Sequence, residues 1–164
     1  MTSAPTDRRF KTTPGWAAAS ALAVGVVALA ASPAGLGFEG GAVVREAFAP
    51  FCHQIAERSP HAGGVPFALC HRCTGIVAGL ALGLIAGPLA PVLGRLAARP
   101  PLLVLALAAL PTTADWLLGA TGVWANTSAS RLVTGAFFGV AAGLLLAVAF
   151  CATVPSSLAS SSDA

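Results

Sequence analysis

The sequence predicts an all-α, polytopic membrane protein with four transmembrane helices, because of its composition, its long apolar runs and its arginine placement. Of 164 residues, 56% are hydrophobic and 9% are charged, and the mean hydropathy is +0.82. Soluble domains average about 25% charged residues, so too little polar surface remains to keep a globule of this size in water. The net charge of +3 is too small to indicate nucleic-acid binding. The partner we expect is therefore the lipid bilayer, and a homo-oligomer or a second membrane protein is left open.

Four apolar runs define the expected spans. They cover residues 16–31, 74–93, 102–118 and 132–154. The fourth run carries no charge and is long enough to cross about 30 Å of hydrocarbon at about 1.5 Å per residue. Pro88 and Pro91 are expected to kink or end the second run. The sequence therefore predicts one membrane domain over residues 16–154.

Basic residues predict the orientation of this domain. Residues 1–15 form a basic segment expected in the cytoplasm, and the long loop at about 32–73 is expected outside. Five basic residues would face the cytoplasm and four would lie outside: Arg8, Arg9, Lys11, Arg95 and Arg99 against Arg45, Arg58, Arg72 and Arg131. Both termini would then be cytoplasmic. The serine-rich tail, residues 155–164, is expected to be disordered.

The first run has an alternative interpretation. Arg8-Arg9-Phe10-Lys11, a short apolar stretch and Ala-Ala-Ser-Pro-Ala are also typical of a cleaved signal peptide, which would leave three spans. The run extends toward Phe38 without a good small-x-small pattern, which favours a retained anchor. Either interpretation places the following loop outside.

Glycines recur every four residues in two of the runs. They are Gly75, Gly79, Gly83 and Gly87 in the second run, and Gly135, Gly139 and Gly143 in the fourth. Such faces let two helix backbones approach closely in lipid, so we expect these two spans to touch. The two spans also begin alike, with Arg72-Cys73-Thr74-Gly75 and Arg131-Leu132-Val133-Thr134-Gly135, which suggests a duplicated hairpin.

Cysteine and histidine cluster in the long loop. Every histidine and all but one cysteine lie between residues 52 and 73: Cys52, His53, His61, Cys70, His71 and Cys73. Thiolate and imidazole are the ligands that soft and borderline metals prefer, and Cys-x-x-Cys spacing lets two thiolates share one ion. The expected ligands of a zinc, copper or iron ion are Cys52, His53, Cys70 and Cys73. His61 and His71 are expected at the surface.

The same cysteines support a second hypothesis, a disulfide that is structural or redox-active. Cysteines outside the cytoplasm usually form disulfides. Cys70 and Cys73 would then be the redox pair and Cys52 the resolving thiol. A helix N-terminus at Cys73 and the charge of Arg72 would both favour a thiolate. Cys151, deep in the fourth run, is expected to be an inert buried thiol.

Asp115 is the only ionisable residue inside an expected span. A carboxylate there costs several kcal/mol unless it is paired or hydrated, and so it is a functional candidate. Arg131 is its expected partner, because an arginine at a helix N-terminus opposes the helix dipole and needs a compensating charge. The pair would lock two helices, support the metal site together with Arg72, or serve a small transporter. The sequence shows no set of a nucleophile, a base and an orienting residue, so a hydrolase is not expected.

These motifs resemble a DUF2085-like family of small prokaryotic membrane proteins, whose signature reads CHQ…ERS…CxRCTG. The resemblance is carried by Phe51-Cys52-His53-Gln54-Ile55, Glu57-Arg58-Ser59, Gly63-Gly64 and Cys70-His71-Arg72-Cys73-Thr74-Gly75. Pro111…Asp115 and Arg131…Thr134-Gly135 are similar to its second block, with Trp116 in place of the usual glycine and Thr127-Ser128 in place of the usual asparagine. The resemblance implies a multi-pass membrane protein and no established activity.

Overall fold

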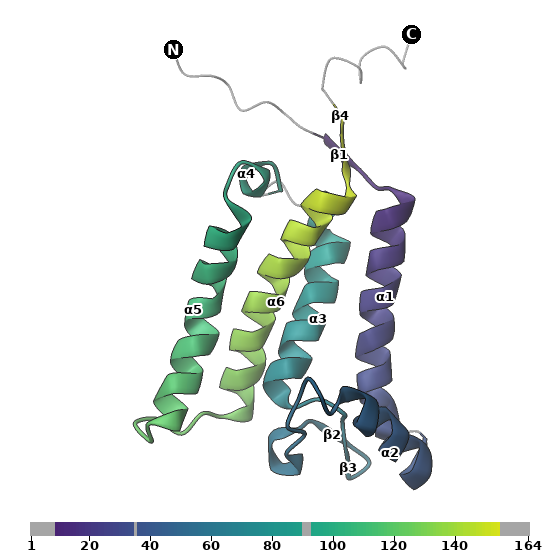
Figure 1. The fold of residues 1–164 in the computed structure, drawn as a ribbon, viewed down its shortest axis with the longest axis vertical. Coiled ribbons are helices and arrows are strands. Elements are labelled where there is room, and N and C mark those ends of the chain that lie inside the picture. Colours follow the sequence, from purple (N-terminus) through teal and green to yellow (C-terminus); the bar gives the residue numbers. More distant parts are fainter. Residues whose placement is uncertain (1–8, 35, 90–92, 155–164) are drawn as a thin grey trace.

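The computed structural model describes residues 9–34, 36–89 and 93–154, and it is predominantly helical (Figure 1). Its helices are α1 (Pro14–Ala31), α2 (Gly37–Phe48), α3 (His71–Ala86), α4 (Leu93–Ala97), α5 (Pro101–Ala120) and α6 (Ser128–Phe150). The 3-10 turns are η1 (Ser32–Ala34), η2 (Ala56–Arg58) and η3 (Gly87–Leu89). Antiparallel pairing joins β1 (Arg9–Lys11) to β4 (Ala152–Val154) and β2 (His61–Ala62) to β3 (Val65–Pro66). The expectations for residues 1–8 and 155–164 lie outside the described residues.

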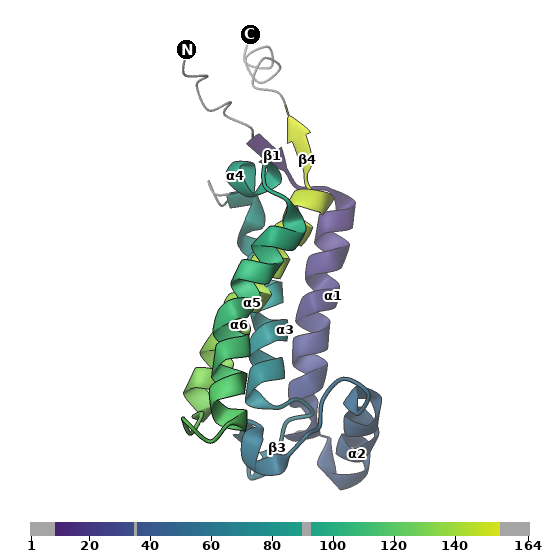
Figure 2. The same cartoon turned by 60° about the vertical axis from the view of Figure 1, so that its left-hand side comes forward.

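The four long helices lie side by side in the order α1, α3, α6 and α5 (Figure 1). The central pair is α3 with α6, which run in the same direction; α1 packs on α3 and α5 packs on α6. One end of the molecule carries α4 and the β1–β4 pair, and the other carries α2, the β2–β3 hairpin and the α5–α6 connection (Figure 2). The Cys/His loop and the β1–β4 pair are therefore at opposite ends of the molecule.

Three helices in the described ranges, α1, α5 and α6, are long and apolar enough to cross a membrane. The fourth, α3, is also apolar but has 16 residues. Large apolar side chains point outward from these helices, including Leu22 and Leu102, which are 70% and 81% exposed. Lipid tails are a suitable environment for such faces, whereas water is not.

Glycines line the contact between α3 and α6. A Cβ atom placed on Gly79 would lie 2.9 Å from the Cα of Ala136, and one placed on Gly139 would lie 2.9 Å from the carbonyl carbon of Ile76. Gly75 and Gly135 have equally close neighbours in the partner backbone. Any side chain at these positions would force the two backbones apart.

The contact is reciprocal. Gly79 faces the residue that follows Gly135, and Gly139 faces the residue that follows Gly75. Two parallel helices related by a two-fold axis make contacts of this kind. The reciprocity supports the hypothesis of a duplicated hairpin, with α1 and α3 in one copy and α5 and α6 in the other.

Two helix ends differ from the expected spans. The second run was expected to reach residue 93, but α3 ends at Ala86 and passes into η3, which contains Gly87 and Pro88. The fourth run was expected to reach Val154, but α6 ends at Phe150. Thr153 and Val154 are β-branched and precede Pro155, a combination that favours extended backbone. They pair with β1 instead.

The long loop was expected to contain no helix, yet α2 forms there. Gly37, Gly40 and Gly41 lower its intrinsic helix propensity. Tertiary contacts offset that cost: a Cβ on Gly41 would meet the backbone of Pro33, and Val44 is buried. The helix places its C-terminal end beside the thiol-bearing turn.

Candidate metal centre

The turn after α2 positions the first thiol. Cys52 is buried, and its backbone N–H donates to the Phe48 carbonyl over 3.2 Å. Two residues later Gln54 has a left-handed backbone with φ of 52°, which is uncommon for a residue other than glycine. Its side-chain Nε2 donates to the Arg45 carbonyl over 2.6 Å. This bond satisfies a carbonyl in the last turn of α2 and holds the Cys52–Gln54 turn in place.

The start of α3 supplies the other two thiols. Cys70 is the N-cap of α3, and Cys73 lies one turn into the helix. The Cys70 backbone N–H donates to the Cys52 sulfur over 3.3 Å. Thr74 donates through its N–H to the Cys70 carbonyl over 2.8 Å and through its hydroxyl to the Leu69 carbonyl over 3.2 Å. The CxRCTG motif therefore begins α3 and directs both thiols toward Cys52.

The Sγ atoms of Cys52, Cys70 and Cys73 all lie within 4.8 Å of one another. At a Zn–S bond length of about 2.3 Å, tetrahedral geometry separates two sulfurs by about 3.8 Å. Only a small contraction would therefore place the three sulfurs around one ion. All four cysteines of the chain carry free thiols in the structure.

The thiols lie in a pocket that is apolar on one side and open on the other. Beneath them is an apolar cluster containing Ala30, Leu69 and Val77. Above them is an open pocket of about 190 Å³. Its walls come from the CHQ turn and the start of α3: Phe51, Cys52, His53, Gln54, Ile55, Arg58, Cys70, Arg72 and Cys73.

The structure separates the three histidines from the thiols to different degrees. His53 lines the pocket and is exposed, but it is outside the group of atoms that lie within 4.8 Å of one another. The Nδ1 atoms of His61 and His71 form hydrogen bonds with the carbonyls of Ser59 and Arg58, at 2.9 and 2.7 Å. Cys151 caps the far end of α6, at the opposite end of the molecule from the pocket.

The environment of Cys70 favours its thiolate. The Cys73 thiol donates a hydrogen bond to the Cys70 sulfur and is the main reason that the pKa of Cys70 falls to about 5. The Cys73 backbone N–H, the Cys52 thiol and the Arg72 backbone N–H act in the same direction, while burial opposes them. The Arg72 side chain was expected to favour this thiolate, but its guanidinium is turned toward Asp115.

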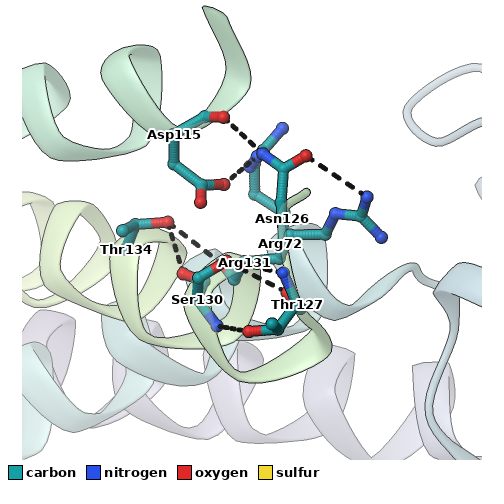
Figure 3. A network of polar contacts seen from close by, with 7 residues as sticks. All are labelled: Arg72, Asp115, Asn126, Thr127, Ser130, Arg131 and Thr134. Atoms are coloured by element: carbon teal, nitrogen blue, oxygen red, sulfur yellow. Dashed lines mark hydrogen bonds and ion pairs between the residues drawn. The ribbon is translucent and has the colours of Figure 1, made fainter. Parts of the chain in front are cut away.

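Asp115 pairs with Arg72 of α3 and not with Arg131, the partner expected from the sequence (Figure 3). Asn126 accounts for the difference, because it occupies the space between Asp115 and Arg131. Its amide donates to the Asp115 backbone carbonyl, and its Oδ1 accepts from Arg131 over 3.5 Å. A Cβ on Gly119 would lie 2.6 Å from the Asn126 Nδ2, so the bare glycine makes room for this side chain.

The α5–α6 connection supports this network. Thr127 is the N-cap of α6 and forms a capping box with Ser130: the Ser130 N–H donates to Thr127 Oγ1 over 3.0 Å, and the Thr127 N–H donates to Ser130 Oγ over 3.1 Å. Thr134 Oγ1 donates back to the Ser130 carbonyl over 2.7 Å. These bonds fix the backbone from which Asn126 and Arg131 extend.

These features define a helical membrane protein with a three-thiol pocket and a half-buried ion pair at one end of its helices. Residues 52–145 match the model of a family described as "Predicted membrane protein (DUF2085)". The match spans more than half of the chain, so the protein belongs to this family, which confirms the resemblance carried by the CHQ and CxRCTG motifs. No curated protein and no solved structure matches the chain.

Proposed function

We propose that this protein binds a thiophilic transition-metal ion at the extracytoplasmic face of the membrane, with Cys52, Cys70 and Cys73 as its sulfur ligands. The observation that carries the proposal is the convergence of three free thiols from two separate segments to within 4.8 Å. Three thiolates favour copper(I) or zinc over hard cations. The Cys/His loop thus supplies a binding site, and the helices hold it at the membrane surface.

The pocket suggests that the bound ion is exchangeable. Structural zinc sites are closed by four protein ligands, whereas sites that act on a further ligand keep one position open. Here three sulfurs converge at the base of an open pocket. His53, which lines that pocket, is the candidate for the remaining coordination position. An incoming ligand or water would take the same position.

The proposal includes four spans and an extracytoplasmic loop. Sixteen residues of α3 extend about 24 Å at about 1.5 Å per residue, which with η3 approaches the hydrocarbon thickness. The contact with α6 through glycines suits helices packed in lipid. Arg9, Lys11, Arg95 and Arg99 belong to the end that carries α4 and the β1–β4 pair, which supports placing that end in the cytoplasm.

Metal analysis of detergent-purified protein tests the proposed function. We expect about one thiophilic ion per chain, lost in Cys52→Ser, Cys70→Ser and Cys73→Ser. The matched control is Cys151→Ser, because this thiol lies at the opposite end of the molecule, and it should bind like the parent. A parent protein that binds neither zinc nor copper(I) under reducing conditions contradicts the proposal.

A second function, thiol–disulfide exchange, is favoured by one observation: Cys70 and Cys73 form a Cys-x-x-Cys pair at a helix N-terminus, and the pKa of Cys70 is lowered to about 5. In that function the two thiols would transfer two electrons and two protons to a disulfide-bearing partner. Mass spectrometry that finds a Cys70–Cys73 disulfide in native membranes, with no bound metal, would favour it. Transport has less support, because the pairing with Arg72 accounts for the Asp115 charge.

A further inference from the structure

Metal binding and disulfide formation make competing demands on the three-thiol site. An ion held by all three sulfurs leaves none of them free, whereas a disulfide between Cys70 and Cys73 leaves Cys52 as the only sulfur ligand. In the structure the three thiols are free, and their Sγ atoms lie within 4.8 Å of one another. One arrangement of side chains therefore precedes both states, and each state excludes the other.

We propose that oxidation of Cys70 and Cys73 to a disulfide releases the bound ion, so that the site holds its ion only while these two thiols are reduced. The oxidant is a disulfide carried by a partner molecule. This inference rests on the proposed function and adds how the ion is released. It differs from thiol–disulfide exchange as a function of its own, because here the exchange controls the occupancy of the metal site.

The exchange has two steps. The Cys70 sulfur attacks one sulfur of the partner disulfide, which forms a mixed disulfide and expels the other partner sulfur as a thiolate. The Cys73 sulfur then attacks the Cys70 sulfur, closes the Cys70–Cys73 bond and expels the second partner sulfur. Two electrons thus pass from the two cysteine thiolates to the partner, whose thiolates take protons from solvent. The ion dissociates because Cys52 is its only remaining sulfur ligand.

The first argument is the position of the redox pair. Cys70 is the N-cap of α3 with an extended backbone, φ −67° and ψ 163°, and Cys73 lies in the first helical turn. Reactive Cys-x-x-Cys pairs of disulfide oxidoreductases have this spacing, and helix N-termini favour the reactive thiolate. The Thr74 N–H donates to the Cys70 carbonyl over 2.8 Å. The Cys70 side chain can therefore rotate toward Cys73, to an S–S distance of about 2.0 Å, without opening the helix.

The second argument is that the three thiols differ in burial. Cys52 is 7% exposed and packs with Ala30 and Leu69 in the apolar cluster, whereas Cys70 and Cys73 are half-buried. The open pocket gives a partner disulfide access to these two thiols. The Cys52 sulfur accepts the Cys70 backbone N–H over 3.3 Å, a contact that does not require the other two sulfurs to be reduced. Cys52 thus stays in place as the ligand to which the ion returns after reduction.

The third argument is the number of ligands that remain. The thiolate is the form of cysteine that binds metal, and a disulfide sulfur carries no negative charge. Within the described residues, the three cysteines are the only group of three or more candidate ligands. Oxidation would leave Cys52 and the pocket residue His53, which is fewer than the three protein ligands of an open zinc site.

Zinc(II) and a dipyridyl disulfide test the inference in the detergent-purified parent. The reduced protein is loaded with zinc, freed of excess ion and treated with the disulfide. A chromogenic chelator reports the zinc released, and the absorbance of thiopyridone reports the thiols oxidised. We expect about one zinc ion and about two thiopyridones for each Cys70–Cys73 disulfide found by peptide mass spectrometry. Reduction with dithiothreitol, followed by its removal, should restore zinc binding.

Three variants separate the parts of this expectation. Metal-free Cys52→Ser should still close the Cys70–Cys73 disulfide, although it lacks one zinc ligand. Cys73→Ser should stop at the mixed disulfide on Cys70. The control is Cys151→Ser, which should release zinc and form the disulfide like the parent, because this thiol lies at the opposite end of the molecule.

The parent alone decides the inference if a variant does not fold. A disulfide that includes Cys52, zinc that stays bound after the Cys70–Cys73 bond has closed, or zinc lost with mixed disulfides alone would each overturn it and leave the metal site standing. A reduced parent that binds no zinc also overturns it. In that case binding of copper(I) preserves the proposed function, and binding of neither ion overturns both.

Discussion

Gly83 of α3 and Gly143 of α6 meet face to face: a Cβ on Gly83 would lie 3.0 Å from the Gly143 Cα, and a Cβ on Gly143 would lie 2.9 Å from the Gly83 Cα. At such a contact the backbones themselves form the packing surface. Dispersion and lipid release, and not a hydrophobic driving force, then hold the helices together. The contact also fixes the relative position of the N-terminal ends of α3 and α6, which carry Arg72 and Arg131.

Replacing Gly83 with Leu should therefore destabilise the protein, because the side chain would overlap the α6 backbone. We expect the free energy of unfolding to fall by at least about 1–3 kcal/mol, which would be measured as a lower melting temperature in detergent. Gly25→Leu is the matched control, since a Cβ on Gly25 would have no neighbour within 4 Å. Equal melting temperatures for the two variants would argue against the α3–α6 contact.

The orientation of the loop can be tested with single-cysteine variants. In a variant that keeps only Cys70, a membrane-impermeant maleimide should label intact, reduced cells, because the proposed orientation places the pocket outside the cytoplasm. In a variant that keeps only Cys151, labelling should require disruption of the cells and unfolding, because this thiol is buried at the opposite end of the chain. Labelling of Cys70 only after lysis would place the loop in the cytoplasm.

The sequence was sufficient to predict helical membrane character and the three convergent cysteines, because hydropathy and Cys-x-x-Cys spacing are local signals. The predicted partner of Asp115 was wrong. Arg131 was chosen because it is nearer in sequence, whereas Arg72 is brought close only by the α3–α6 contact. Spacing along the chain does not report which side chain fills the space between two helices.

The structural roles of two residues of the site, Asn126 and Gln54, were not predicted from the sequence. Asn126 carried no prediction of its own, and its role appears only in the fold, where it bridges Arg131 to the Asp115 backbone carbonyl on the preceding helix. Gln54 belonged to a recognised motif, but its left-handed backbone is unusual for glutamine and accompanies a side-chain hydrogen bond to the end of α2. Neither role follows from residue type, since both depend on a neighbouring helix end.

Gln54 provides a test of backbone strain beside the thiols. A β-branched residue is poorly tolerated at its φ of 52°, so Gln54→Val should cost about 1–3 kcal/mol and weaken metal binding by shifting Cys52. Gln54→Gly adopts this φ without strain and should lose only the hydrogen bond to Arg45. Calorimetry and cadmium titration of both variants check the expectation, which fails if valine is tolerated as well as glycine.

The thiol chemistry of the metal-free protein should depend on pH in a way that identifies the Cys70–Cys73 contact. The thiolate is the reactive form, and the pKa of Cys70 is lowered to about 5 from the ordinary value of a cysteine thiol. The alkylation rate of Cys70 by iodoacetamide should therefore rise as the pH passes about 5 and be nearly constant between pH 7 and pH 9, the range in which an ordinary thiol becomes more reactive. Cys73→Ala removes the hydrogen bond that contributes most to this shift, so its Cys70 should react with a midpoint at higher pH.

The measurement is peptide mass spectrometry of protein alkylated for fixed times in the presence of a chelator, with denatured protein giving the unshifted profile. A parent profile that coincides with the denatured one would show that the three sulfurs do not share hydrogen bonds in solution, and it would remove the support that this contact gives to thiol–disulfide exchange.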